Sequence, residues 1–122
     1  KMREFPRTKF ILWTGAALVK SETDKEAAGR AKVFFDWVRN HWDESGDNIF
    51  LWDFRALETE GGLYLKETFA SGDSHPNESF SRNVAPHFCR RIVDVILGQG
   101  DQRSLTGAED GKSGSKAPSR GK

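Results

Sequence analysis

The sequence predicts an α/β domain with parallel strands, because two apolar runs flank a stretch of helical pattern. Residues 9–13 (KFILW) and 48–54 (NIFLWDF) are short apolar runs typical of strands that are buried on both faces. Residues 21–46 between them carry apolar side chains at three- and four-residue spacing. A strand, a helix and a strand in this order form a βαβ unit, with parallel strands and a right-handed crossover.

The predicted helix between the strands has a start signal, an apolar face and a stop signal. Thr23, with Glu26 three residues later, fits a capping box. Gly46 can take the left-handed conformation that ends a helix. The apolar face consists of Ala28, Ala31, Phe35, Val38 and Trp42.

A second helix is predicted over residues 78–97, with Asn77 or Ser79 as its cap. Pro86 lies inside the pattern, so the helix either is kinked or begins nearer Ala85. Its apolar face consists of Val84, Phe88, Ile92, Val95 and Ile96.

Two strands alone do not make a doubly wound sheet, and apolar strands of this kind need neighbours on both sides. We therefore expect a partner segment, upstream in the gene or on another chain, to supply the missing strands. Residues 1–98 are interpreted as the C-terminal portion of such a domain. Residues 99–122 are rich in Gly, Ser and Lys and contain no aromatic residue, which predicts a disordered tail.

Composition excludes several classes of function. A net charge of +1 gives no basic face for nucleic acid, and no apolar run is long enough to span a membrane. The single cysteine, Cys89, has no disulfide partner within the chain and is interpreted as a buried thiol. The three histidines have no metal-ligand spacing, and we expect neither a metal nor a cofactor.

The connection over residues 55–77 is the candidate functional loop, because long irregular loops in compact domains are usually functional. It leaves the carboxyl end of the second strand, the edge at which open parallel sheets bind ligands. Asp73 and His75 lie in this loop just before a helix. There the imidazole could act as general base for a serine, with the carboxylate fixing its tautomer. An ordinary turn that holds an acid and a histidine is the alternative interpretation.

The motif DSHPN at residues 73–77, followed by an amphipathic helix, resembles the last conserved block of the SGNH hydrolases, also called GDSL esterases and lipases. Residues 9–18 (KFILWTGAAL) are similar to the strand that follows the family's Gly-x-Asn-Asp block, and residues 34–54 are similar to the next helix and strand. The resemblance covers about residues 9–97. It implies a flavodoxin-like α/β/α sandwich and hydrolysis of esters or thioesters, commonly on lipid or carbohydrate substrates, and the expected partner is a small ester substrate.

In that family, an acid and a histidine near the end of the domain complete a triad with a serine near its beginning. The resemblance therefore implies His75 as the catalytic base and Asp73 as the residue that orients it. The sequence departs from the family in having Gly72 three residues before the histidine, where the acid usually lies. Either Asp73 orients His75 from two residues away, or a backbone carbonyl does so.

A second departure is that neither a nucleophile block nor a Gly-x-Asn-Asp block occurs in these residues. Ser74 lies in a GDS triplet, but it follows the wrong elements and is too close in sequence to His75, so we reject it as the nucleophile. The serine is expected outside this chain. Two other hypotheses stay open: a non-catalytic α/β binding module, and a truncated, inactive fragment of such a hydrolase.

Other residues near the same edge have ordinary structural interpretations. Asp53 ends the second strand and is more typical of a structural acid, and residues 14–17 (TGAA) of a plain turn. Residues 63–65 could form a pocket wall. His41 is interpreted as a helix-surface residue and His87 as a side chain packed beside the last helix.

Overall fold

The computed structural model describes residues 1–108, which form two strands with helices around them. In chain order the main elements are β1 (Phe10–Trp13), α1 (Lys25–Trp37), β2 (Ile49–Trp52), α2 (Phe54–Thr59) and α3 (Glu78–Ile96). A π-helical turn at Val38–Trp42 extends α1, and short 3₁₀ turns lie at Met2–Glu4, Lys20–Glu22 and Glu67–Phe69. No helix in the described part of the chain has the length and apolar character needed to cross a membrane.

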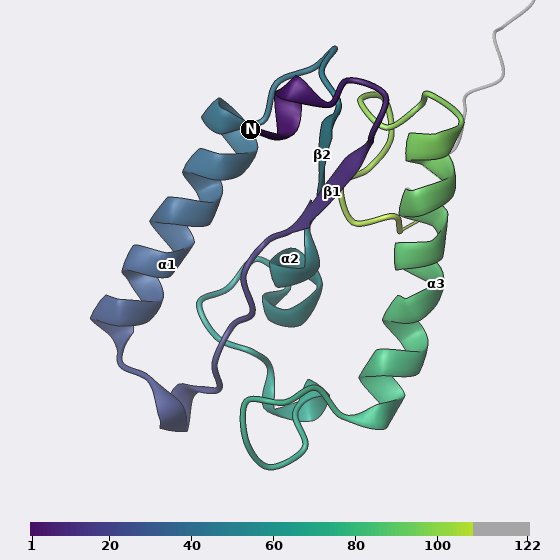
Figure 1. Ribbon diagram of the computed structural model, residues 1–122. Helices are drawn as coiled ribbons and strands as arrows, with labels where there is room; N and C mark the ends of the chain where they lie inside the picture. Colours follow the sequence, from purple (N-terminus) through teal and green to yellow (C-terminus); the bar gives the residue numbers. More distant parts are fainter. Residues whose placement is uncertain (109–122) are drawn as a thin grey trace, which may run out of the picture.

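The two strands form a parallel pair, as the sequence predicts. The register runs from Phe10 opposite Ile49 to Trp13 opposite Trp52. The strands lie between α1 on one side and α3 on the other (Figure 1). The α/β class is therefore confirmed, with a two-stranded parallel sheet within the described residues.

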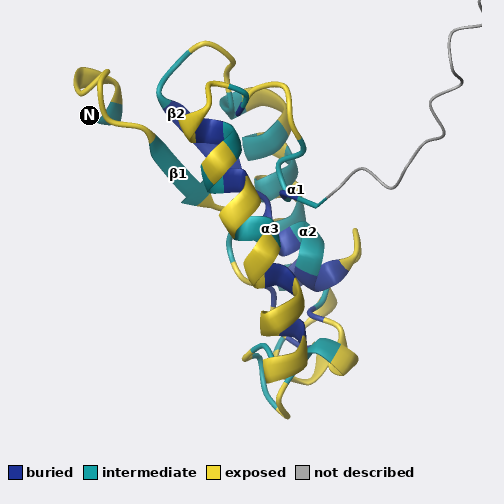
Figure 2. Ribbon diagram, turned by 90° about the vertical axis from the view of Figure 1, so that its right-hand side faces the viewer, coloured by how far each residue is buried: buried dark blue, intermediate teal, exposed yellow. Residues whose placement is uncertain are grey.

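The two strands differ in burial, although the sequence predicts both to be buried on both faces. All of β2 is buried, whereas β1 is mostly half-buried (Figure 2). Trp13 at the end of β1 exposes 52% of its surface. The prediction is wrong for β1 because α3 and the segment after it pack mainly on β2 and leave Trp13 half exposed.

Helix α1 begins one residue later than a capping box at Thr23 would require. The N-cap is Asp24, whose carboxylate accepts a hydrogen bond of 2.8 Å from the N–H of Ala27. Thr23 has extended backbone angles and lies before the cap. A carboxylate is favoured at a helix start for two reasons. It accepts a hydrogen bond from a free N–H of the first turn, and its negative charge interacts favourably with the helix dipole.

The connection after β2 is not irregular throughout, because α2 occupies its beginning. Asp53 caps α2 by accepting a hydrogen bond of 3.2 Å from the N–H of Ala56. With six residues, α2 is too short to show the apolar periodicity that reveals a helix in a sequence.

Helix α3 matches its prediction closely. It begins at Glu78, and the Asn77 side chain accepts a hydrogen bond of 2.8 Å from the N–H of Phe80. Pro86 lies inside the helix, so the alternative start near Ala85 is wrong. The Asn77 cap gives a first-turn N–H group a hydrogen-bond acceptor, so the helix can begin eight residues before Pro86.

Residues 99–108 pack against the sheet, although the sequence predicts a disordered tail from residue 99. The Trp52 indole donates to the Thr106 carbonyl at 2.8 Å, and the Asp53 N–H donates to the Leu105 carbonyl at 2.8 Å. Composition could not reveal this, because these bonds use the tail's backbone carbonyls and not its side chains. The remainder of the predicted tail, 109–122, lies outside the described residues.

We expect Gly107→Ala to loosen this segment. Gly107 has a φ of +70°, and a Cβ there would lie 1.9 Å from the His87 carbonyl oxygen. Gly98 is a matched control, since it has a φ of +75° but nothing within 4 Å of the added atom. Gly98→Ala should cost about 1–2 kcal/mol of unfolding free energy from backbone strain alone. In urea titrations followed by tryptophan fluorescence, equal losses for the two variants would contradict a close approach at Gly107.

Candidate functional site

The loop between the 3₁₀ turn Glu67–Phe69 and α3 brings the two predicted site residues together. Asp73 Oδ2 lies 2.9 Å from His75 Nδ1, and Asp73 Oδ1 accepts the His75 N–H at 2.8 Å. The acid therefore holds both the backbone and the ring of the histidine. Of the two orienting groups that the sequence left open, Asp73 is the one at the ring.

The loop is closed by its own backbone. The Ser71 N–H donates to the His75 carbonyl at 2.9 Å, and Ala70 and Pro76 form an antiparallel bridge. Gly72 at the tip has a φ of +95°, which glycine adopts without the steric cost that other residues pay. An aspartate at position 72 would be strained in this conformation, whereas Asp73 is not.

The loop is anchored to the chain that follows β1. The Ser74 hydroxyl accepts a hydrogen bond of 3.0 Å from the Val19 N–H and donates to the Glu22 carboxylate. Ala17, Val19 and Leu65 form a buried cluster against which Phe69 and Ala70 pack. In Figure 1 both strands run toward this loop, so the pair lies on the side of their carboxyl ends.

The electrostatics of the pair favour an ionised acid. Hydrogen bonds from the backbone and ring of His75, together with one from Ser71, hold the pKa of Asp73 below its usual value. The His75 side chain is 83% exposed and that of Asp73 49%. Solvent or a further segment of protein can therefore reach the ring edge that faces away from Asp73.

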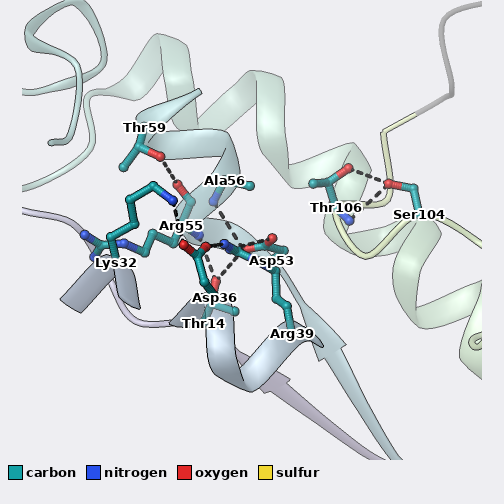
Figure 3. Close-up of polar contacts among 10 residues, drawn as sticks. All are labelled: Thr14, Lys32, Asp36, Arg39, Asp53, Arg55, Ala56, Thr59, Ser104 and Thr106. Atoms are coloured by element: carbon teal, nitrogen blue, oxygen red, sulfur yellow. Dashed lines mark hydrogen bonds and ion pairs between the residues drawn. The ribbon is translucent and has the colours of Figure 1, made fainter. Parts of the chain in front are cut away.

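A separate polar network joins the carboxyl ends of both strands to α1 (Figure 3). The Thr14 hydroxyl donates to Asp53 Oδ1 at 2.9 Å, and Arg39 donates to both Asp53 oxygens at 3.1 and 3.0 Å. Arg39 also pairs with Asp36. Asp53 is buried and serves as the cap of α2, which agrees with its structural interpretation.

Glu58 on α2 is a buried acid that the sequence did not reveal. Its side chain is fully buried, and Oε2 accepts the Ala17 N–H at 2.8 Å. Oε1 has no hydrogen-bond partner within residues 1–108. Burial raises the pKa of Glu58 to about 7, against the lowering effects of the Ala17 N–H and the Arg55 charge. A glutamate in a predicted loop gives no signal of such burial.

The proposed pocket wall at residues 63–65 is formed in part. Leu63 lines a hollow of about 180 Å³ together with Ala16, Leu18 and Arg55. Leu65 instead belongs to the buried cluster under the loop. The turn after β1 thus contributes to a small hollow next to α1.

The other two histidines and the cysteine make no hydrogen bond or ion pair with Asp73 or His75. His41 is exposed on the π-helical turn, as interpreted, and His87 is half-buried on α3.

Cys89 is exposed, so its interpretation as a buried thiol is wrong. Cys89 falls between the positions that α3 buries, which are Phe80, Val84, Arg91 and Val95. Among the described residues, no three His, Cys, Asp or Glu side chains form a group that could hold a metal ion.

Comparison with known proteins gave no match to a family model, to a curated protein or to a solved structure. The resemblance to the SGNH hydrolases therefore depends on the sequence motif and its spacing.

Proposed function

We propose that this chain carries the histidine and the orienting acid of an SGNH-type serine hydrolase that acts on small esters. The serine and the oxyanion donors belong to residues outside this chain. The observation that carries the proposal is the hydrogen bond between Asp73 Oδ2 and His75 Nδ1, at 2.9 Å. The domain to which residues 1–108 contribute is proposed to be a flavodoxin-like α/β/α sandwich, supported by parallel strands between two helices.

The pair is suited to general-base catalysis. With Nδ1 bonded to Asp73, the proton on the neutral ring resides at Nδ1, and Nε2 is left to accept the proton of a serine hydroxyl. The ionised carboxylate then stabilises the imidazolium, and His75 returns the proton to the leaving alcohol. A depressed Asp73 pKa supports this role, because the acid stays charged at neutral pH.

The contacts of the neighbouring serines support a nucleophile from elsewhere. The hydroxyl of Ser71 lies 3.1 Å from the His75 carbonyl oxygen and 3.3 Å from Asp73 Oδ1, so its single proton has an acceptor inside the turn. The hydroxyl of Ser74 is bonded to Val19 and Glu22. Both hydroxyls therefore hold the loop in place.

The test is hydrolysis of p-nitrophenyl acetate by the complete gene product in which this chain occurs. We expect His75→Ala to lower kcat/KM by about 10²- to 10⁴-fold, the usual contribution of a general base. His41→Ala is the matched control, because it removes an exposed histidine from another surface. Asp73→Asn should also lower kcat, because an amide leaves the imidazolium without a counter-charge. Equal activity in the His75 and His41 variants would exclude a catalytic role for His75.

A non-catalytic α/β binding module is the second candidate. It is favoured by one observation: no serine hydroxyl among residues 1–108 makes a hydrogen bond to the His75 ring. Absence of esterase activity in the unmodified complete protein, across acetyl and longer acyl esters, would favour the module.

A further inference from the structure

Arg55 on α2 is a buried cation without an acidic partner. It is 4% exposed, and its guanidinium donates to the Leu63 carbonyl at 3.2 Å and to the Ala16 carbonyl at 3.4 Å. None of the ion pairs among residues 1–108 includes it. Buried arginines in folded proteins are normally paired with an acid, and a guanidinium has further N–H groups beyond the two in use here.

The acids that act electrostatically on Arg55 do not neutralise it. Asp36 and Asp53 both pair with Arg39. Glu58 makes no ion pair with Arg55, and because its pKa is about 7 it is protonated part of the time at neutral pH. Burial lowers the pKa of Arg55 against the opposing effect of Glu58, which reflects a charge held away from water. Arg55 therefore lacks a full counter-charge among the described residues.

The same side chain lines a small hollow between the start of α1, α2 and the chain that follows β1. The hollow measures about 180 Å³, and Thr23 is the other polar residue on its wall. The wall otherwise consists of alanines and leucines: Ala16, Leu18, Ala27, Ala28, Ala31 and Leu63. An engineered apolar cavity of about 150 Å³ holds one benzene molecule, so a ligand of about six non-hydrogen atoms suits a space of this size.

We propose that this hollow binds a short-chain aliphatic carboxylate of about the size of butyrate. The carboxylate pairs with the guanidinium of Arg55, whose planar fork matches two carboxylate oxygens. The alkyl chain lies against the alanine and leucine wall and is removed from water. A neutral ligand would leave the buried charge unpaired, and an inorganic anion would leave the apolar wall uncovered.

The site is separate from the proposed catalytic pair, because neither Asp73 nor His75 lines the hollow. It is nevertheless close to the chain that anchors their loop: Leu18 on its wall precedes Val19, whose N–H bonds to Ser74. A short-chain carboxylate is also the acid that hydrolysis of a short ester releases. Only this last link rests on the proposed function, and binding itself requires no catalysis.

The test is a titration of the complete gene product with sodium butyrate, followed through the amide resonances of Leu18, Ala28 and Leu63 in NMR spectra. We expect saturable shifts at these amides. Butyramide has the chain without the charge, and inorganic phosphate has charge without the chain. Each should bind at least about tenfold more weakly than butyrate. Equal affinity for either compound would overturn the proposal, as would the absence of saturable shifts at these amides.

Two substitutions test the two parts of the site. Arg55→Gln should raise the Kd for butyrate at least about tenfold, because the charged donor is lost. Ala31→Leu fills the hollow from α1 and keeps Arg55, so it should remove saturable binding even if Arg55→Gln does not fold.

Ala85→Leu, on the exposed side of α3, is the matched control for Ala31→Leu and should leave butyrate binding unchanged. Equal effects of the two leucines would contradict binding in the hollow. His75→Ala should also keep the Kd for butyrate, so a failure of esterase activity is distinguishable from a failure of carboxylate binding.

Discussion

Replacement of Arg91 by alanine should lower the free energy of unfolding by about 3 kcal/mol or more. Arg91 is 1% exposed and donates to the Leu51 carbonyl at 2.7 Å and to the Gly100 carbonyl at 2.6 Å. It thereby joins α3, β2 and the segment after α3. Without the guanidinium two buried carbonyls lose charged donors, and each costs about 1–3 kcal/mol.

Arg82 on the same helix is the control for Arg91. Arg82 is exposed and pairs with Glu78 one turn earlier, a type of contact that contributes about 0.3–0.5 kcal/mol. Urea titration of both alanine variants should separate them by several-fold in stability loss. Arg91→Lys should recover only part of the loss, because an ammonium lacks the planar fork that reaches both carbonyls. Similar losses for Arg91→Ala and Arg82→Ala would mean that the sheet edge does not depend on the buried arginine.

The stability of the chain should depend on pH through Glu58. Burial raises the pKa of this carboxyl from 4.5 to about 7. The folded state therefore binds a proton that the unfolded state releases between these values. Stability from the protonated form is complete below pH 4.5 and is lost as pH rises through 7. The shift corresponds to about 3 kcal/mol over this interval.

Glu58→Gln should remove this component. The amide oxygen can still accept the Ala17 N–H, and the side chain no longer ionises. The measurement is the unfolding free energy of both proteins between pH 4 and pH 8. We expect the difference between them to change by about 3 kcal/mol in favour of the variant as the pH rises. Comparison below pH 4.5 serves as the internal control, since both side chains are then neutral. Parallel curves would show that Glu58 ionises without cost in the folded chain.

Local pattern predicted the main elements of the fold. Two apolar runs and the helical spacing between them led to a parallel pair, and Asn77 marked the start of α3. The pattern failed at α2, which is too short for periodicity, and at residues 99–108, which are polar in composition. It failed at Cys89 as well, because one apolar-periodic stretch does not say which side of its helix meets the sheet.

The contact at the centre of the candidate site was within reach of sequence reasoning. Asp73 and His75 are two residues apart, so a turn tipped by Gly72 suffices to bring carboxylate and ring together. Where this turn lies relative to the strands was harder to predict from the sequence, because it depends on the hydrogen bond between the Val19 N–H and the Ser74 hydroxyl, 55 residues apart.

The sequence by itself determined the order of β1, α1, β2 and α3, the start of α3 at residue 78 and the closeness of Asp73 to His75. Each of these depends on side chains a few residues apart, whose relative positions follow from local backbone geometry. Only the tertiary structure decided that Glu58 and Arg91 are buried. These features depend on groups about 40 residues apart, Glu58 with Ala17 and Arg91 with Leu51. Burial and partner choice at that separation are set by packing of whole segments, which no local pattern encodes.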